Sequence, residues 1–227
     1  MNRLLLLAPL MTALAMPATA QTVLSLGVTG AAMSAPDEAV AQFEVQVTNP
    51  DAAKAQESVN QMVAKAIAAA RAVADVTVTT GRYSTYTIMA DQKTKAAFTA
   101  QQNLTLTQPA TGGVPNAAFT SLLAKLQSEG LLLVELNGDL SPSGNEKLQR
   151  QAIHNALVKL HAEADSIAAY LHEKVGSLQT LSVDASSDII APMPRMMALA
   201  EAGPQSAPGN ITVTARISAK INIDPPS

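Results

Sequence analysis

The chain has 227 residues, a formal net charge of −3 at pH 7, and neither cysteine nor tryptophan. A mildly acidic chain without a basic cluster is a poor match to nucleic-acid binders, so we expect no nucleic-acid partner. The lack of cysteine excludes disulfides, thiol catalysis and thiolate-ligated zinc or iron–sulfur centres. With only three Tyr and three Phe, the chain also lacks the aromatic surfaces on which lectins stack sugars.

Residues 1–20 have the pattern of a secretory signal peptide. Arg3 supplies a basic start, residues 4–16 are apolar, and an Ala-x-Ala motif ends at Ala20. The apolar run is shorter than the ~20 residues that a membrane-spanning helix needs. We therefore predict cleavage after Ala20, a periplasmic location, and a mature chain over residues 21–227 without a further transmembrane segment.

The N-terminal half of the mature chain alternates between strand and helix patterns. Polar and apolar residues alternate with a period of two in the strands. The helix start is marked by Asn49, Pro50 and Asp51, because a capping side chain and an early proline suit a helix N-terminus. The expected elements are strands at 23–30 and 41–47, a helix to about 74, and a hairpin of strands at 76–89, interrupted near Gly81, and 98–107.

The C-terminal half contains two further helices. The first buries an apolar face and ends at Gly130, and the second runs from about Asn145 to Val175 and ends at Gly176. Residues 185–208 are rich in proline and methionine without a period, which indicates a flexible loop. The strands expected in this half are a buried one at 131–140, a short one at 178–183, and a regularly alternating one at 211–224.

The resulting order, ββ-α-ββ-α-β-α-ββ, has no strict βαβ alternation. Such an order favours the α+β class. We expect one domain over residues 21–227, in which a mostly antiparallel sheet carries the three helices on one face.

The ordered set of short motifs resembles the SIMPL-domain family, which includes many periplasmic or secreted bacterial proteins of unknown function. The chain departs from that pattern at Ala31-Ala32 and at Lys159-Leu160. The resemblance implies an α+β fold, an envelope location, a tendency to form homo-oligomers, and an association with envelope or oxidative stress. The family has no agreed catalytic residues, so none carry over. The motifs are Val28-Thr29-Gly30, Pro36-Asp37-Glu38-Ala39, Ala55, Asn60, Met62, Thr79-Thr80, Tyr83, Tyr86, Ala100-Gln101-Gln102, Gln151 to Ala156, Lys159 and Pro208-Gly209-Asn210.

The three histidines of the chain fall on the expected long helix. His154, His161, Asp165 and His172 lie along one line beside its apolar stripe. His161 and Asp165, four residues apart, could hold one ion between them. The other two histidines are roughly 10 Å or more from that pair, beyond a shared coordination sphere. A polar helix flank, or one side of a subunit contact, is the simpler interpretation, so we predict no metal site.

A second candidate is the methionine cluster Met193, Met196 and Met197. Thioethers suit Cu(I) outside the cytoplasm, and exposed methionine is oxidised reversibly. Methionine also fills apolar gaps, and a mobile loop that docks on a neighbour or on lipid explains the cluster equally well. This leaves a periplasmic copper binder or oxidant scavenger as an alternative function.

No pattern in the chain identifies a reaction. There is no Gly-x-Ser-x-Gly motif, and Gly112-Gly113 lacks the lysine of a phosphate loop. Two acidic pairs, Asp37 with Glu38 and Glu163 with Asp165, are better explained as surface charge. We therefore predict no catalytic residue and no cofactor, while an enzyme of unrecognised type remains a further alternative.

The leading hypothesis is a non-catalytic periplasmic protein that acts by self-assembly or by contacts with envelope partners, in envelope or oxidative stress tolerance. An exposed edge strand, such as the terminal one at 211–224, could pair with a neighbouring subunit.

Overall fold

The computed structural model describes residues 22–88, 97–184 and 208–225. The predicted signal peptide and nearly all of the predicted loop at 185–208 lie outside these residues. The element order confirms the predicted one and the α+β class. The elements are β1 (Thr22–Ser34), β2 (Glu38–Asn49), α1 (Ala52–Arg71), β3 (Thr77–Ile88), β4 (Ala97–Pro109), the 3₁₀ turn η1 (Thr111–Gly113), α2 (Ala117–Ser128), β5 (Leu132–Asp139), α3 (Pro142–Tyr170), β6 (Lys174–Asp184) and β7 (Ile211–Asp224).

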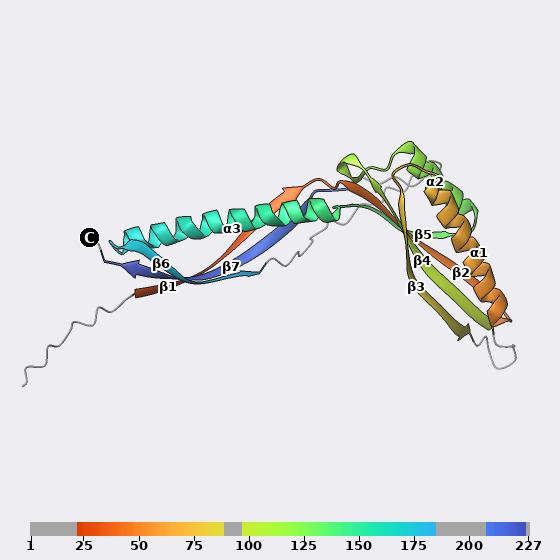
Figure 1. Ribbon diagram of the computed structural model, residues 1–227, viewed down its shortest axis with the longest axis horizontal. Coiled ribbons are helices and arrows are strands. Elements are labelled where there is room, and N and C mark those ends of the chain that lie inside the picture. The colour runs from red at the N-terminus through yellow and green to blue at the C-terminus, as the bar shows by residue number, and fades with distance from the viewer. Residues whose placement is uncertain (1–21, 89–96, 185–207, 226–227) are drawn as a thin grey trace, which may run out of the picture.

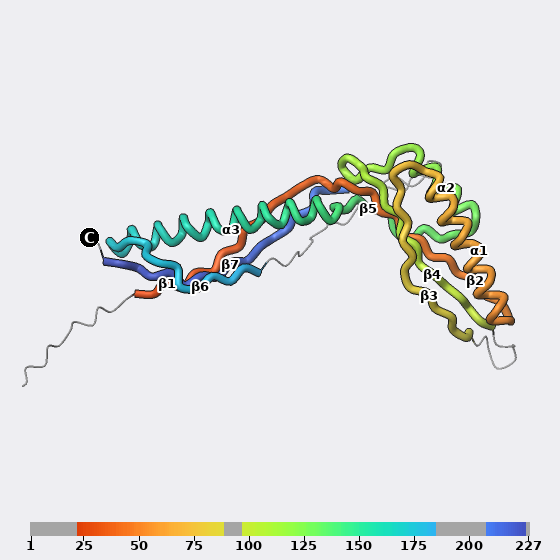
Figure 2. Tube along the Cα trace, in the orientation of Figure 1, coloured from red at the N-terminus to blue at the C-terminus, as the bar shows by residue number. Residues whose placement is uncertain are grey.

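The strands form two antiparallel sheets rather than the single sheet that we expected. One has the order β1-β7-β6 and the other the order β3-β4-β2-β5. Figure 1 shows α3 lying along the three-stranded sheet, and we call these elements the α3 lobe. The helices α1 and α2 cover one face of the four-stranded sheet, and together they form the α1 lobe. The two lobes meet at an angle, so the molecule is long and bent (Figure 2).

The core of the α1 lobe follows the predicted periodicity. The Asp51 side chain caps α1 by accepting a hydrogen bond from Ala53 N at 2.9 Å. Small residues on the buried face let α1 pack closely on the sheet, beside fully buried Phe43 and Phe119. The buried positions recur at three- and four-residue steps: Ala55, Val59, Val63, Ala66 and Ala70.

Two strands of the α1 lobe differ in how well the sequence described them. The pairing of β3 with β4 shifts between Thr80 and Tyr83, which confirms the predicted interruption near Gly81. The strand predicted at 131–140 is present as β5, but the prediction that it is buried was wrong. Among the described strands β5 pairs with β2 alone, at the edge of its sheet, and Leu132 and Val134 are 64% and 59% exposed.

The buried side of α3 advances by four residues at each step. A step of four exceeds the 3.6 residues of one turn, so the buried stripe winds around the helix in a right-handed sense. The twisted β1-β7-β6 sheet follows this stripe beneath the helix (Figure 1). Gly30 on β1 allows the close approach, because a Cβ atom there would lie 2.7 Å from Ala156 Cα. The buried positions are Leu148, Ala152, Ala156, Leu160, Ala164 and Ala168.

The long helix ends earlier than predicted. Leu171 is its C-cap, and His172 has a left-handed φ of 58°. His172 N donates to Ala169 O, and Glu173 N donates to Ala168 O, in the pattern of a Schellman motif. Val175 therefore belongs to β6, where it packs against the core of the α3 lobe. The helical spacing of apolar residues in the sequence continues past the end of α3, which is why the predicted helix was too long. His172, rather than a glycine, adopts the left-handed conformation that ends the helix.

Replacing His172 with glycine should raise the free energy of unfolding by about 0.5–1 kcal/mol. Glycine adopts a positive φ without the steric cost of a Cβ atom, although it loses more backbone entropy on folding. Urea unfolding of the purified chain measures the change. Gly130→Ala is the matched control, because Gly130 has a φ of 93° at the same position after α2, and this substitution should lower stability instead.

Candidate functional site

The chain passes between the two lobes at a compact junction held by Asp37. Its carboxylate accepts hydrogen bonds from Ser141 N at 2.5 Å and from Ser141 Oγ at 2.8 Å. Ser141 caps α3 and accepts from Gly144 N at 3.0 Å. A carboxylate at a helix N-terminus is favoured by the unpaired N–H groups there. Asp37 therefore links the start of β2 to the first turn of α3.

Three small residues complete the packing of this junction. Gly138 on β5 lies so close to Pro208 and Gly113 that a Cβ atom on Gly138 would be 2.6 Å from Pro208 Cγ. Gly113 is one of the two loop glycines that we compared with a phosphate loop. Its place against Gly138 and Pro208 gives it a packing role between the lobes.

Glu38 is a partly buried carboxyl group at this junction. It lies opposite Asp139 in the pairing of β2 with β5. Partial burial raises the pKa of Glu38, and the negative charges of Asp37 and Asp139 raise it further. None of these carboxylates has an ion-pair partner among the described residues. The junction thus tolerates unfavourable charge next to the carboxylate that anchors α3.

Replacing Glu38 with glutamine should therefore stabilise the protein slightly at pH 7, by less than about 1 kcal/mol because solvent screens the charges. A raised pKa in the folded state means that folding takes up a proton, so the contribution of Glu38 to stability is full below its ordinary pKa and is lost as the pH rises through the raised value. The advantage of Glu38→Gln should vanish below the ordinary pKa of glutamate.

Urea unfolding of both proteins between pH 4 and pH 8 measures this difference. Glu44→Gln, on the same strand, controls for the loss of one negative charge. A difference between Glu38→Gln and the wild type that does not change over this pH range would contradict the prediction.

The predicted histidine flank does not come together as a site. His154, His161 and Asp165 are exposed on α3, and His172 lies beyond its C-cap. The described residues contain no group of three or more His, Asp or Glu side chains that could hold a metal ion. A metal at His161 and Asp165 would need a ligand from elsewhere, so the absence of a metal site remains a prediction.

The methionine cluster Met193, Met196 and Met197 lies outside the described residues. The copper-binding or oxidant-scavenging alternative therefore also remains a prediction. Titration with Cu(I), repeated after replacement of all three methionines, would decide it.

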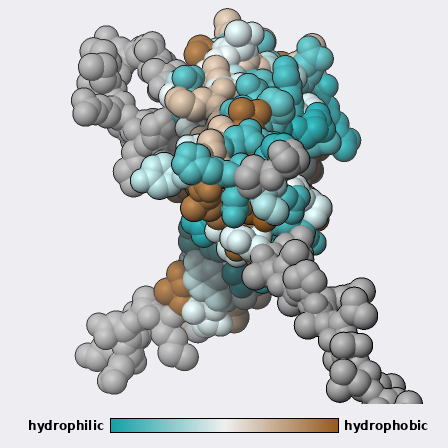
Figure 3. All heavy atoms as spheres, turned by 90° about the vertical axis from the view of Figure 1, so that its left-hand side faces the viewer, coloured by the Kyte–Doolittle hydropathy of each residue, from teal (hydrophilic) through white to brown (hydrophobic). Residues whose placement is uncertain are grey.

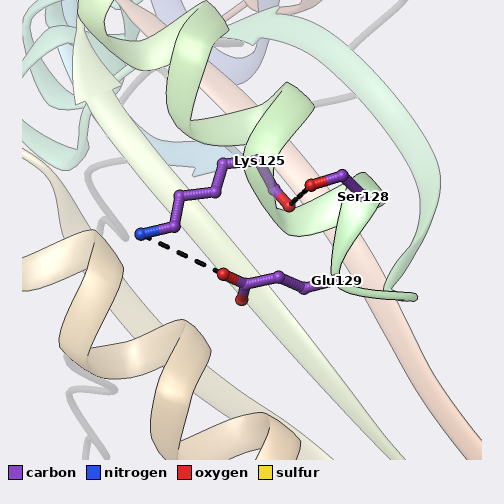
Figure 4. A network of polar contacts seen from close by, with 3 residues as sticks. All are labelled: Lys125, Ser128 and Glu129. Atoms are coloured by element: carbon purple, nitrogen blue, oxygen red, sulfur yellow. Dashed lines mark hydrogen bonds and ion pairs between the residues drawn. The ribbon is translucent and has the colours of Figure 1, made fainter.

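Three acidic residues on or next to the helices form ordinary surface pairs with basic residues four positions away. Figure 4 shows Lys125 and Glu129 at the end of α2, 4.0 Å apart, with Ser128 Oγ donating to the Lys125 carbonyl oxygen. Glu163, of the acidic pair that we interpreted as surface charge, lies 3.8 Å from Lys159. Exposed pairs of this kind contribute little to stability, and they suggest no chemistry.

The feature that sequence reasoning missed is apolar surface on the strands. Leu178, Leu181 and Val183 on β6 are between 44% and 52% exposed. Tyr83 and Tyr86 on β3 are exposed as well. Figure 3, seen from the α3-lobe end, shows apolar residues among the polar ones on the surface. Alternation alone could not reveal this, because it does not say which strands lie at sheet edges.

No helix of the described residues is long and apolar enough to cross a bilayer. A search of curated proteins returned no match. The family model for SIMPL, described as a protein of unknown function (DUF541), matches residues 24–221, which is most of the chain and includes both lobes. The chain belongs to the SIMPL family.

Proposed function

We propose that the protein is a non-catalytic component of the periplasm that acts by self-assembly or by contacts with envelope partners. The observation that supports this best is the openness of its sheets. Each sheet has helices on one face, and β1, β6, β3 and β5 each have a single strand partner among the described strands. Unpaired strand edges are templates for pairing with another chain. Exposed apolar side chains on β3, β5 and β6 add contact surface.

The periplasmic location rests on the signal-peptide pattern of residues 1–20. Intact mass of the protein purified from the periplasm should correspond to a chain that starts at Gln21. Replacing Ala18 and Ala20 with arginine should block this cleavage, because signal peptidases require small residues there. Recovery of the full-length wild-type chain in the cytoplasm would contradict the proposed location.

Sedimentation velocity of residues 21–227 over a wide concentration range tests self-assembly. We expect the average mass to rise with concentration towards a defined oligomer. In-cell crosslinking followed by mass spectrometry tests the envelope-partner arm of the proposal. A monomer at every concentration, together with no specific crosslinked envelope protein, would refute the proposed function.

A role in stress tolerance is the finer part of the proposal, supported by the family resemblance. Cells that lack the protein should survive peroxide or envelope-perturbing detergent less well than the parent. Expression of the wild-type chain should restore survival, whereas the chain without residues 1–20 should not. Equal survival of the deletion strain under both stresses would remove this part alone.

A further inference from the structure

β6 lies at the edge of the three-stranded sheet, with two register shifts between Val175 and Thr180. It pairs with β7 on one side, and no described strand lies on its other side. Its residues Lys174–Asp184 contain no proline, and charged residues occur only at the two ends. Natural edge strands are usually protected by an inward charge, a proline or a bulge that turns the edge away. The stretch between the ends of β6 carries no such charge or proline.

The apolar layer of the α3 lobe continues onto this edge, where its side chains are partly exposed. Leu178, Leu181 and Val183 lie opposite three β7 residues that are at most 6% exposed, so they point to the same face of the sheet as α3. They are nevertheless about half exposed, whereas their neighbours on β7 are buried. Burying such side chains would be favourable at about 25 cal/mol per Å² of apolar surface. The β7 neighbours are Ile221, Ala219 and Ile217.

The charges at the two ends of β6 are complementary to each other. Lys174 lies opposite Asp224 of β7, and Asp184 lies opposite Arg216. If a second β6 runs antiparallel with Gln179 on a two-fold axis, Lys174 of each copy faces Asp184 of the other. At each end of the interface, the charged residues of four adjacent strands, β7 and β6 of one copy followed by β6 and β7 of the other, then alternate in sign. Opposite charges in directly opposed positions stabilise a pair of strands.

The same register also matches apolar residues. It places Val175 of one copy opposite Val183 of the other, and both lie on the face covered by α3, opposite Ile223 and Ile217 of β7. The irregular part of β6, between Val175 and Thr180, falls near the axis. The charge pairs and the valine pairs therefore lie at the two ends of the interface.

We propose that two copies of this chain pair through β6, antiparallel and about a two-fold axis near Gln179, to join their three-stranded sheets into one six-stranded sheet. This inference rests on the proposed self-assembly and names its interface. The occupant of the edge is a second copy because the edge is complementary to itself in charge and in apolar residues, as an isologous interface requires.

The remaining edges fit this role less well. β3 carries Arg82 and β5 carries Glu135 within the strand, whereas β6 is charged only at its two ends. A charge within an edge strand discourages pairing there. All three strands have register shifts against their partners, so these shifts do not distinguish them. β1 is uncharged, but its apolar residues on the helix face, Val28 and Ala32, are already buried under α3.

The first test uses the double substitution Leu178→Glu and Leu181→Glu in the chain over residues 21–227. Sedimentation velocity should show the dimer dissociation constant raised at least about 100-fold, since each subunit would bring two charges to the helix-covered face of the interface. Val134→Glu is the control, because Val134 is also an exposed apolar residue on an edge strand, β5, and it should leave the constant unchanged. Circular dichroism and urea unfolding confirm that each variant is folded.

The second test examines the register. Asp184→Lys alone and Lys174→Asp alone should each weaken the dimer about tenfold, because attraction becomes repulsion at both ends. The double exchange Lys174→Asp with Asp184→Lys should restore the dissociation constant to within about threefold of the wild type. A merely structural effect of the single substitutions would not be reversed by the exchange.

The outcomes separate this inference from the proposed function. An oligomer that persists unchanged in the Leu178→Glu, Leu181→Glu variant would overturn the β6 interface and leave self-assembly standing. A monomer at every concentration would refute both. A failed rescue by the double exchange would overturn the two-fold arrangement. So would a mass that grows without limit as the concentration rises, because pairing of β1 with β6 would produce an open chain of subunits.

Discussion

Replacing Gly30 with alanine is expected to lower the free energy of unfolding by about 3 kcal/mol or more. A Cβ atom on Gly30 would overlap with Ala156 N and Ala152 O and would lie 2.7 Å from Ala156 Cα. These are backbone atoms of a long helix, so no side-chain rotation can relieve the overlap. β1 and α3 would have to separate, which would open the core of the α3 lobe.

Gly27→Ala provides the matched control on the same strand. The nearest atom to a Cβ there is Ser218 Oγ at 3.9 Å, an ordinary contact. Neither glycine has a positive φ, so the two substitutions differ mainly in space. Urea unfolding should therefore show a change within about 0.5 kcal/mol for Gly27→Ala. Similar losses for both variants would show that helix contact is not the cause.

The second large effect is expected at the junction between the lobes. Gly138→Ala should lower the free energy of unfolding by about 2 kcal/mol. Its Cβ would lie 2.6 Å from Pro208 Cγ, 2.7 Å from Pro208 Cβ and 3.0 Å from Gly113 Cα. The proline ring is rigid, and Gly113 offers only backbone, so the strand and the loop must move apart.

A double-mutant cycle identifies the cause of this loss. Pro208→Gly removes the ring, and it should by itself destabilise the chain through greater freedom of the unfolded state. Combined with Gly138→Ala, it should cost at least about 1 kcal/mol less than the sum of the two single changes. Additive losses in urea unfolding would mean that the two residues do not compete for the same space.

The order of the elements was predictable because each element carries its own period. β7 occupies Ile211–Asp224 as predicted, since its alternation is uninterrupted and the sheet buries one face of it. α2 ends where Gly130 supplies a positive φ. In these cases the information that determines the structure lies within a few residues of the element itself.

The arrangement of the strands was not predictable in the same way. β2 and β7 have the same alternating pattern, yet they lie in different sheets. Periodicity reveals which side of a strand is buried, but not which distant strand lies beside it. The exposure of β5 and β6 depends on that pairing, which is why a buried strand was expected at 131–140.

The candidate site shows the same limit. Asp37 and Glu38 are adjacent in the sequence, and both were interpreted as surface charge. Asp37 instead accepts hydrogen bonds from Ser141, 104 positions along the chain. Only the return of the chain to the junction after β5 brings these groups together, and no local pattern records it.

The α1 lobe is inserted between β1 and α3, and this has a consequence for the order of folding. Residues 38–139 form one continuous segment that contains every strand of its own sheet. β1, by contrast, pairs with β7, so Thr22 meets Ile223. Because contacts between distant residues carry a large loop-closure entropy, the α1 lobe should form early and the α3 lobe last. During synthesis, β1 must remain without its partner until nearly all of the residues up to β7 have emerged, when protection by a chaperone would matter most.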